Sequence, residues 1–115
     1  MINISACNVT LMVSDLDKST RFYADVLGFK IIQRYGNHYA QISAPGIVIG
    51  LHPARTAIRT NENISLGFSI TDFEQAIPAL NAFSISYVER NEQGGNFIHF
   101  NDPDGYPLYF IKPKQ

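Results

Sequence analysis

The sequence contains only one cysteine, Cys7, and few charged residues. With a single thiol no disulfide can form within the chain, which excludes a secreted scaffold built on disulfides. No run of lysine or arginine occurs and the formal net charge is -1, so nucleic acid and anionic membranes are poor candidates for partners. Long hydrophobic runs and a signal-peptide pattern are also missing. We therefore expect a cytoplasmic protein that binds neither nucleic acid nor a membrane.

What the sequence does contain is the composition of a globular protein, with 45% hydrophobic and 17% charged residues among its 115. This length allows one substantial core but not two independent ones, so we expect a single domain. Residues 53–63 are polar and show no clear period, which is typical of a connector. Cys7 lies beside an apolar segment and is expected to be a small core residue.

The first half of the chain is patterned as one strand, one helix and three further strands. Residues 8–13 are rich in valine, threonine and leucine and predict the first strand. Ser14 or Asp15 then caps a helix whose apolar stripe extends to Leu27, and Gly28 is placed to end it. The three further strands are expected at residues 29–35, 38–43 and 47–52.

The second half repeats this order. Residues 64–70 predict a strand, and Thr71 with Glu74 three positions later matches a capping box in front of a helix at residues 73–82. Pro78 falls inside this helix, where it should cause a kink or a late start. Three strands follow, at residues 84–90, 97–100 and 107–112.

The two halves also resemble each other residue by residue. Residues 11–16 and 68–73 share the pattern apolar, any, apolar, small hydroxyl, aspartate, apolar. Because this self-similarity recurs about half a chain apart, it predicts a tandem duplication. We expect one repeat at about 1–53 and the other at 63–115, joined by the polar connector.

A hairpin near the C-terminus carries the clearest turn signal. Pro103 presets φ at the first corner, the Asp102 side chain can bond to the backbone two residues on, and Gly105 can adopt the left-handed conformation. Pairing around this turn sets His99 opposite Tyr109. We therefore expect these two side chains on the same face of the sheet.

Four motifs, in this order along the chain, resemble the vicinal oxygen chelate superfamily: residues 13–19, 22–23, 26–29 and 101–105. That superfamily contains glyoxalase I, extradiol dioxygenases, fosfomycin-resistance transferases and bleomycin-resistance proteins. The resemblance implies an α+β fold in which tandem β-α-β-β-β units form a cupped mixed sheet with helices on its outer face. It also implies a ligand site on the concave face, and small members commonly pair, so we expect a homodimer.

In metal-dependent members of that superfamily, four ligands come from the first and last strands of the two units. The matching positions in this sequence are Asn8, Gly50, Ser65 and Tyr109. Gly50 offers no ligand, Asn8 and Ser65 are weak neutral donors, and Tyr109 could bind only as a phenolate. These residues therefore predict that the protein has no metal cofactor.

Aromatic and polar residues occupy further positions that are expected to face the cup. Histidines there can orient a polar ligand or exchange protons, and aromatic walls suit a planar small molecule. The expected ligand-binding residues are Asn8, Tyr39, Gln41, His52, Ser65, Tyr87, His99 and Tyr109.

Three functional hypotheses follow from these positions. The first is a small-molecule-binding protein of the glyoxalase/bleomycin-resistance type that lacks the usual metal site. The alternative is a metal-dependent lyase or dioxygenase with one divalent ion held by a rearranged ligand set, His52, His99 and Tyr109. A third possibility is a concave surface that serves mainly for association.

Overall fold

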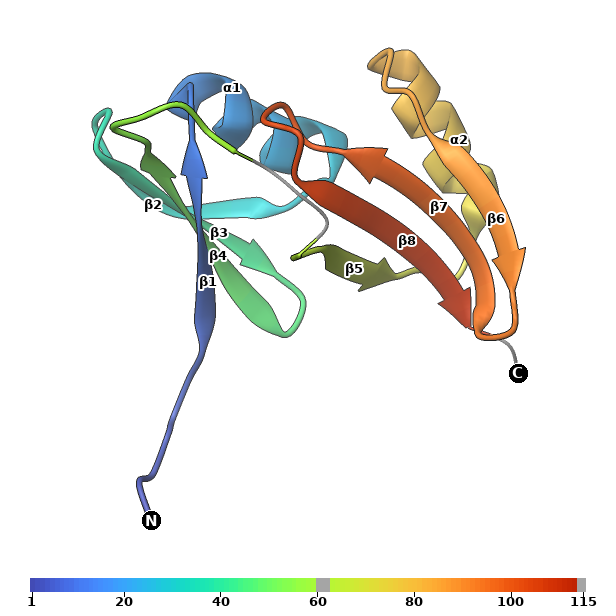
Figure 1. The fold of residues 1–115 in the computed structure, drawn as a ribbon, viewed down its shortest axis with the longest axis horizontal. Coiled ribbons are helices and arrows are strands. Elements are labelled where there is room, and N and C mark those ends of the chain that lie inside the picture. Colours follow the sequence, from blue (N-terminus) through green and yellow to red (C-terminus); the bar gives the residue numbers. More distant parts are fainter. Residues whose placement is uncertain (60–62, 114–115) are drawn as a thin grey trace. The chain divides into compact units, whose positions relative to one another are not determined.

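The computed structural model describes residues 1–59 and 63–113, and the chain divides into two compact units, Met1–Ile58 and Arg59–Gln115. Each unit holds one four-stranded sheet and a helical segment (Figure 1). The division falls within the stretch predicted to be a connector, and the exact repeat boundaries stay a prediction. Among the described residues, no helix is long and apolar enough to cross a membrane.

The first unit has four strands: β1 (Asn8–Val13), β2 (Lys30–Tyr35), β3 (Tyr39–Ala44) and β4 (Ile47–Pro53). They form one mixed sheet in the order β1-β4-β3-β2. β1 runs parallel to β4, whereas the pairs β4 with β3 and β3 with β2 are antiparallel. Because β4 is a central strand, its side chains are held between neighbours on both sides.

The helical segment of the first unit begins directly after β1. Asp15, one of the two predicted caps, accepts a hydrogen bond at 3.1 Å from the backbone N–H three residues on and so starts α1 (Leu16–Arg21). We predicted a continuous α-helix to Leu27, but a π-helix, η1 (Phe22–Val26), follows α1. The Leu27 N–H donates to a carbonyl five residues back, so this last turn is wider than an α-helical one.

The two faces of the first sheet have different roles. α1 packs on β3 and β4, and alternate side chains of the strands are buried. The buried residues of the strands are Leu11, Val13, Ala40, Ile42, Ala44, Ile49 and Leu51. The intervening residues form the opposite face. Cys7 was predicted to join the core, but it is exposed, because β1 begins one residue after it.

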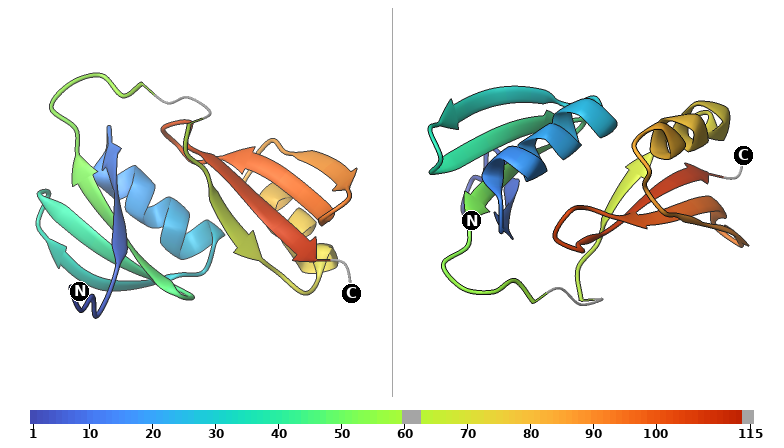
Figure 2. Two further views of the ribbon diagram at one scale, coloured as in Figure 1. Left: turned by 60° about the horizontal axis from the view of Figure 1, so that its bottom comes forward. Right: turned by 90° about the horizontal axis from the view of Figure 1, so that it is seen from above.

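The second unit has four strands and one helix: β5 (Leu66–Ser69), α2 (Phe73–Ala82), β6 (Val88–Glu92), β7 (Gly95–Asn101) and β8 (Pro107–Pro113). The sheet order is β5-β8-β7-β6, with β5 parallel to β8 and the other pairs antiparallel. In each unit the helix lies along one face of its own sheet (Figure 2). The predicted α+β fold of tandem β-α-β-β-β units is thus confirmed, with one mixed sheet in each unit.

The start of α2 differs from the predicted capping box. Asp72, not Thr71, caps the helix, because its carboxylate accepts a hydrogen bond from the Glu74 N–H at 2.8 Å. The helix begins at Phe73 and includes Pro78, so the predicted late start does not occur. An aspartate at the cap position competes successfully with a threonine one residue earlier.

The strand predicted to begin at Ser84 begins only at Val88. Ser84 has a φ of 57°, and its N–H donates to the Asn81 carbonyl at 3.0 Å. The next N–H, that of Ile85, donates to the Leu80 carbonyl at 2.9 Å. These residues therefore end the helix before the chain extends again.

The turn between β7 and β8 has the predicted construction. The Asp102 carboxylate is 5% exposed and accepts hydrogen bonds from the N–H groups of Asp104 and Tyr106, each at 2.9 Å. Gly105 adopts the left-handed conformation with a φ of 89°. On the inner side of this sheet the core consists of Leu80, Ile98, Phe100 and Leu108.

Candidate functional site

The first unit gathers polar side chains on the sheet face that points away from its core. Gln41 on β3 and Thr10 on β1 both lie opposite Gly50 on β4. His52 lies two residues further along β4, so it shares the face of Gly50, and Tyr39 lies two residues before Gln41. Three predicted ligand-binding residues, Tyr39, Gln41 and His52, are thereby brought together.

Two hydroxyl groups on this face accept hydrogen bonds from side-chain amides. The Gln41 Nε2 donates to the Tyr39 hydroxyl at 3.5 Å, and the Asn8 Nδ2 donates to the Thr10 Oγ1 at 3.4 Å. A hydroxyl that accepts one bond can still donate its own proton. The predicted residue Asn8 therefore acts here through Thr10, and the face presents two hydroxyl donors.

Gly50 makes room for the Tyr39 ring. A Cβ at Gly50 would collide with the Tyr39 hydroxyl and would come within 3.0 Å of the Thr10 Oγ1. The position that the resemblance assigns to a metal ligand on β4 is therefore covered by a phenol from β3. Tyr39 is half-buried, which fits its place across the strand.

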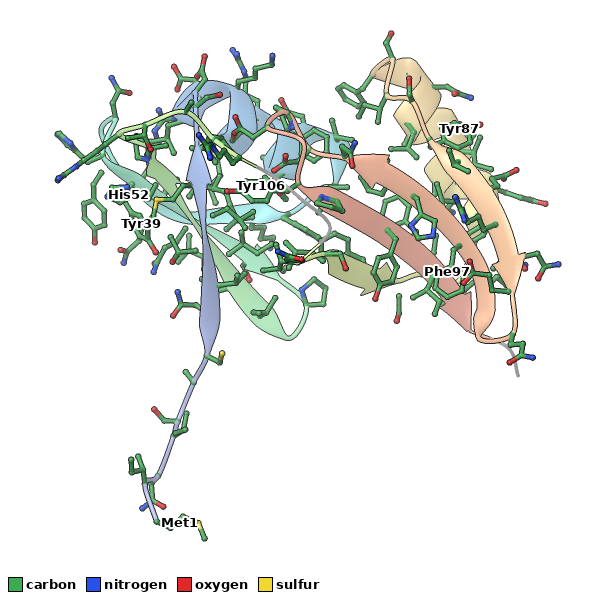
Figure 3. The ribbon with its side chains drawn as sticks, in the orientation of Figure 1. Met1, Tyr39, His52, Tyr87, Phe97 and Tyr106 are labelled. Carbon is green, nitrogen blue, oxygen red and sulfur yellow. The ribbon has the colours of Figure 1, made fainter. Side chains whose placement is uncertain are left out.

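His52 lies at the edge of this polar group. Its ring centroid is 6.4 Å from that of Tyr39, and the two side chains are neighbours in Figure 3. Its Nδ1 is 2.9 Å from the carbonyl oxygen of Pro53. The imidazole is exposed, so its other nitrogen, Nε2, is accessible to a ligand.

The second unit presents an aromatic cluster, Phe97, His99 and Tyr109, on its face away from the core. His99 on β7 pairs with Tyr109 on β8 as predicted, and their ring centroids are 5.8 Å apart. The Phe97 ring is stacked on His99 at 5.8 Å with an interplanar angle of 15°, and it lies 5.9 Å from Tyr109. A Cβ at Gly67 on β5 would collide with the Tyr109 ring. The phenol therefore lies across β5, next to an imidazole.

Two predicted residues of the second unit lie outside this cluster. Ser65 is exposed and precedes β5. Tyr87 precedes β6, and Val88 is the residue that pairs with His99. Tyr87 and His99 nevertheless both line a surface pocket of about 310 Å³ at the end of the sheet, so the structure brings this pair to one pocket.

Metal donors are sparse among the described residues of both units. Among the described residues of each unit, no group of three or more His, Cys, Asp or Glu could hold a metal ion. Of the rearranged set, His99 and Tyr109 are neighbours in the second unit and His52 belongs to the first. The four positions assigned by the resemblance therefore do not fit a metal as a set. The two donors that lie side by side are the His99 imidazole and the Tyr109 phenol.

Sequence reasoning missed three residues of these two faces. Thr10 lies two residues after Asn8 on β1, and Phe97 lies two residues before His99 on β7. Residues two apart in a strand share a face, so strand periodicity could have indicated both. Gly67 had no such signal, because its importance lies in the ring that rests on it.

Residues 6–110 match the family model of the Glyoxalase/Bleomycin resistance protein/Dioxygenase superfamily. The chain belongs to this superfamily. The match covers most of both units, and it confirms the family that the motifs predicted.

Curated relatives of this superfamily member are metallothiol and glutathione transferases by name. The metallothiol transferase FosB of Lysinibacillus sphaericus is 29% identical over 106 residues, covering 85% of this chain and 74% of the relative. The glutathione transferase FosA of Serratia marcescens is 27% identical over 106 residues, covering 88% and 75%.

Solved structures of the superfamily share the fold. The fosfomycin resistance protein FosX of Listeria monocytogenes has a TM-score of 0.83 at 20% identity, covering 99% of this chain and 94% of the other. A FosX variant complexed with Mn(II) and 1S,2S-dihydroxypropylphosphonic acid has a TM-score of 0.82 at 23% identity, covering 99% and 93%. Identities this low show the fold alone.

The prediction that the protein has no cofactor is contradicted by these findings. One relative is a metallothiol transferase by name, and the FosX variant holds Mn(II), which together point to a divalent metal ion. The prediction took weak donors at four family positions as the absence of a metal. Donors elsewhere on the sheets, His52 and His99 with Tyr109, entered only as the alternative with one divalent ion.

Proposed function

We propose that this superfamily member transforms a small molecule with the help of a divalent metal ion. This is the alternative that the sequence left open, and the names of the relatives favour it over binding alone. The observation that carries the proposal is the imidazole–phenol pair of His99 and Tyr109, whose rings lie 5.8 Å apart on neighbouring strands.

His99 and Tyr109 are the donors that the second unit offers to a metal. Imidazole nitrogen is a common ligand for zinc and other transition metals, and a phenolate can add an anionic oxygen. Two donors do not complete a coordination shell, and of the four family positions only that of Tyr109 supplies one of them. Metal binding is therefore measured first.

Each face by itself has groups that suit recognition of a small molecule. In the first unit the hydroxyls of Thr10 and Tyr39 can donate hydrogen bonds to ligand oxygens. In the second unit the Phe97 ring offers an apolar surface beside the imidazole of His99. A cytoplasmic location and a homodimer stay predictions, and analytical ultracentrifugation tests the latter.

Metal binding is tested on protein purified without chelator. We expect mass spectrometry to find a bound divalent ion, and titration with Mn(II), Zn(II), Ni(II) or Fe(II) to raise the melting temperature. An ion at a hundredfold excess over its dissociation constant stabilises by about 2.7 kcal/mol. His99→Ala should remove this shift, whereas Phe97→Leu should keep it, because phenylalanine offers no donor. An ion that binds equally to both variants would exclude His99 as a ligand.

Activity is tested with fosfomycin, because FosX, a solved protein with the same fold, is a fosfomycin resistance protein by name. The protein is incubated with fosfomycin and either glutathione or water, with and without Mn(II), and followed by phosphorus NMR. A metal-dependent new phosphonate signal supports the proposal. If a ligand binds and is recovered unchanged, the second candidate applies, capture of a planar small molecule, which the aromatic cluster favours.

A further inference from the structure

We infer that His52 is a catalytic proton acceptor of this protein and that it acts through its Nε2 atom. The inference rests on the proposed function, because it assigns a chemical role within the transformation of a small molecule. Its physical basis is the hydrogen-bonding state of the imidazole. The Nδ1 of His52 lies 2.9 Å from the carbonyl oxygen of Pro53.

This contact selects one tautomer of the neutral ring. A backbone carbonyl oxygen can only accept a hydrogen bond, so Nδ1 must carry the proton. In neutral imidazole the other nitrogen then has a free lone pair. The Nε2 of His52 is therefore the basic atom, and the Pro53 carbonyl fixes both its identity and the ring orientation.

The surroundings leave this nitrogen accessible on a face suited to a ligand. His52 is exposed. It lies near the end of β4, where its backbone pairs with Met12 of β1. On the other side its neighbour is the ring of Tyr39, 6.4 Å away between centroids. Tyr39 and Thr10 supply hydroxyl donors on the same face, so a base and two donors are presented together.

The reaction step is a simple proton transfer. The S–H or O–H bond of a thiol or hydroxyl group breaks, its proton forms a bond to Nε2, and the electron pair stays on the sulfur or oxygen as the nucleophile. The imidazolium that forms keeps its Nδ1–H bond to the Pro53 carbonyl. The hydroxyls of Thr10 and Tyr39 can donate to negative charge that develops on a ligand oxygen.

The tautomer is measured directly by long-range proton–nitrogen NMR of the labelled full chain, at a pH where imidazoles are neutral. We expect the His52 signals to show a protonated Nδ1 and an unprotonated Nε2. His38, an exposed histidine beside a turn, provides an internal reference. A His52 ring with its proton on Nε2 would overturn the inference.

The reactivity of Nε2 is measured as release of p-nitrophenolate from p-nitrophenyl acetate, which depends on an accessible unprotonated ring nitrogen. The assay uses a Cys7→Ser background, which removes the exposed thiol. His52→Asn keeps an amide donor near the Nδ1 position but has no Nε2, so we expect it to lose a clear part of the protein-dependent rate while keeping its melting temperature. His38→Asn is the matched control and should lose little. An unchanged rate in His52→Asn, or an equal loss in both variants, would contradict the inference.

Neither experiment uses a metal ion or fosfomycin. A negative result for His52 therefore does not contradict the proposed function. If the metal or fosfomycin tests fail, the NMR and ester-cleavage measurements still decide whether His52 accepts a proton at Nε2.

Discussion

The two units have the same order of elements, yet they present different chemistry on the sheet faces away from their cores. The first unit offers hydrogen-bonding groups, Thr10, Tyr39 and His52, whereas the second offers the stacked rings of Phe97 and His99 beside Tyr109. Topology is thus shared and side-chain chemistry is not. In a strand every second residue faces away from the core, so these positions can diverge without changing the fold.

The cores differ as well. Of the fourteen buried hydrophobic residues among those that the structure describes, ten lie in the first unit and four in the second. A larger core holds a truncated side chain among more buried neighbours, so we expect truncation to be more costly in the first unit. The four predictions below test these differences.

The largest effect is expected from Leu51→Ala in the first unit and Leu108→Ala in the second. The two side chains are 0% and 1% exposed, and each truncation should lower the free energy of unfolding by about 2–5 kcal/mol, with the greater loss for Leu51. Urea denaturation measures it. Met12→Ala, on the exposed face of β1, is the control and should cost about 0.5 kcal/mol or less. A greater loss for Leu108 would reverse the comparison of the cores.

The two tyrosine–glycine contacts should respond differently to the same substitution. Gly50→Ala and Gly67→Ala should each cost about 1–3 kcal/mol through overpacking. Tyr39→Phe should relieve Gly50→Ala, because the colliding atom there is the hydroxyl and the nearest ring carbon is 3.1 Å away. Tyr109→Phe should not relieve Gly67→Ala, because ring carbons collide there. A double-mutant cycle in urea measures both couplings; equal relief in the two units would refute the distinction.

The turns before the last strands of the two units are also unlike. In the second unit Asp102→Ala leaves two backbone N–H groups without their carboxylate and should cost about 1–3 kcal/mol. Asp102→Asn retains an acceptor oxygen and should cost less. The first unit makes its turn with Gly46 at a φ of 82°. Thermal unfolding monitored by circular dichroism compares the variants, and an Asn variant as unstable as the Ala variant would argue against the role of the oxygen acceptor.

The smallest effect is expected at the surface of the first unit. Arg34 on β2 forms an ion pair of 2.5 Å with Asp17 on α1, and both side chains reach solvent. Arg34→Ala should cost about 0.2–1 kcal/mol, and high salt should reduce the difference from the unsubstituted protein. If Asp17→Ala in the Arg34→Ala background costs as much as Asp17→Ala alone, the pair contributes nothing.

Much of the site could be predicted because strand periodicity determines which side chains share a face. Strand alternation correctly placed His52 on the same sheet face as Gly50. The turn residues correctly predicted that His99 pairs with Tyr109. The strand predicted over Tyr87 begins at Val88 and not at Ser84, so Tyr87 lies just before β6. The prediction of no cofactor failed for another reason, because weak donors at the inherited positions were given more weight than the alternative set of His52, His99 and Tyr109.

The sequence by itself determined the local structure, since caps, turns and alternating apolar residues act over a few positions. Asp15 starts a helix and Gly105 closes a hairpin for reasons that lie within their own neighbourhoods. Only the tertiary structure decided that Tyr39 covers Gly50, that Tyr109 covers Gly67 and that Phe97 stacks on His99. These contacts depend on the register and rotamers of neighbouring strands, and a linear pattern of residue types contains neither.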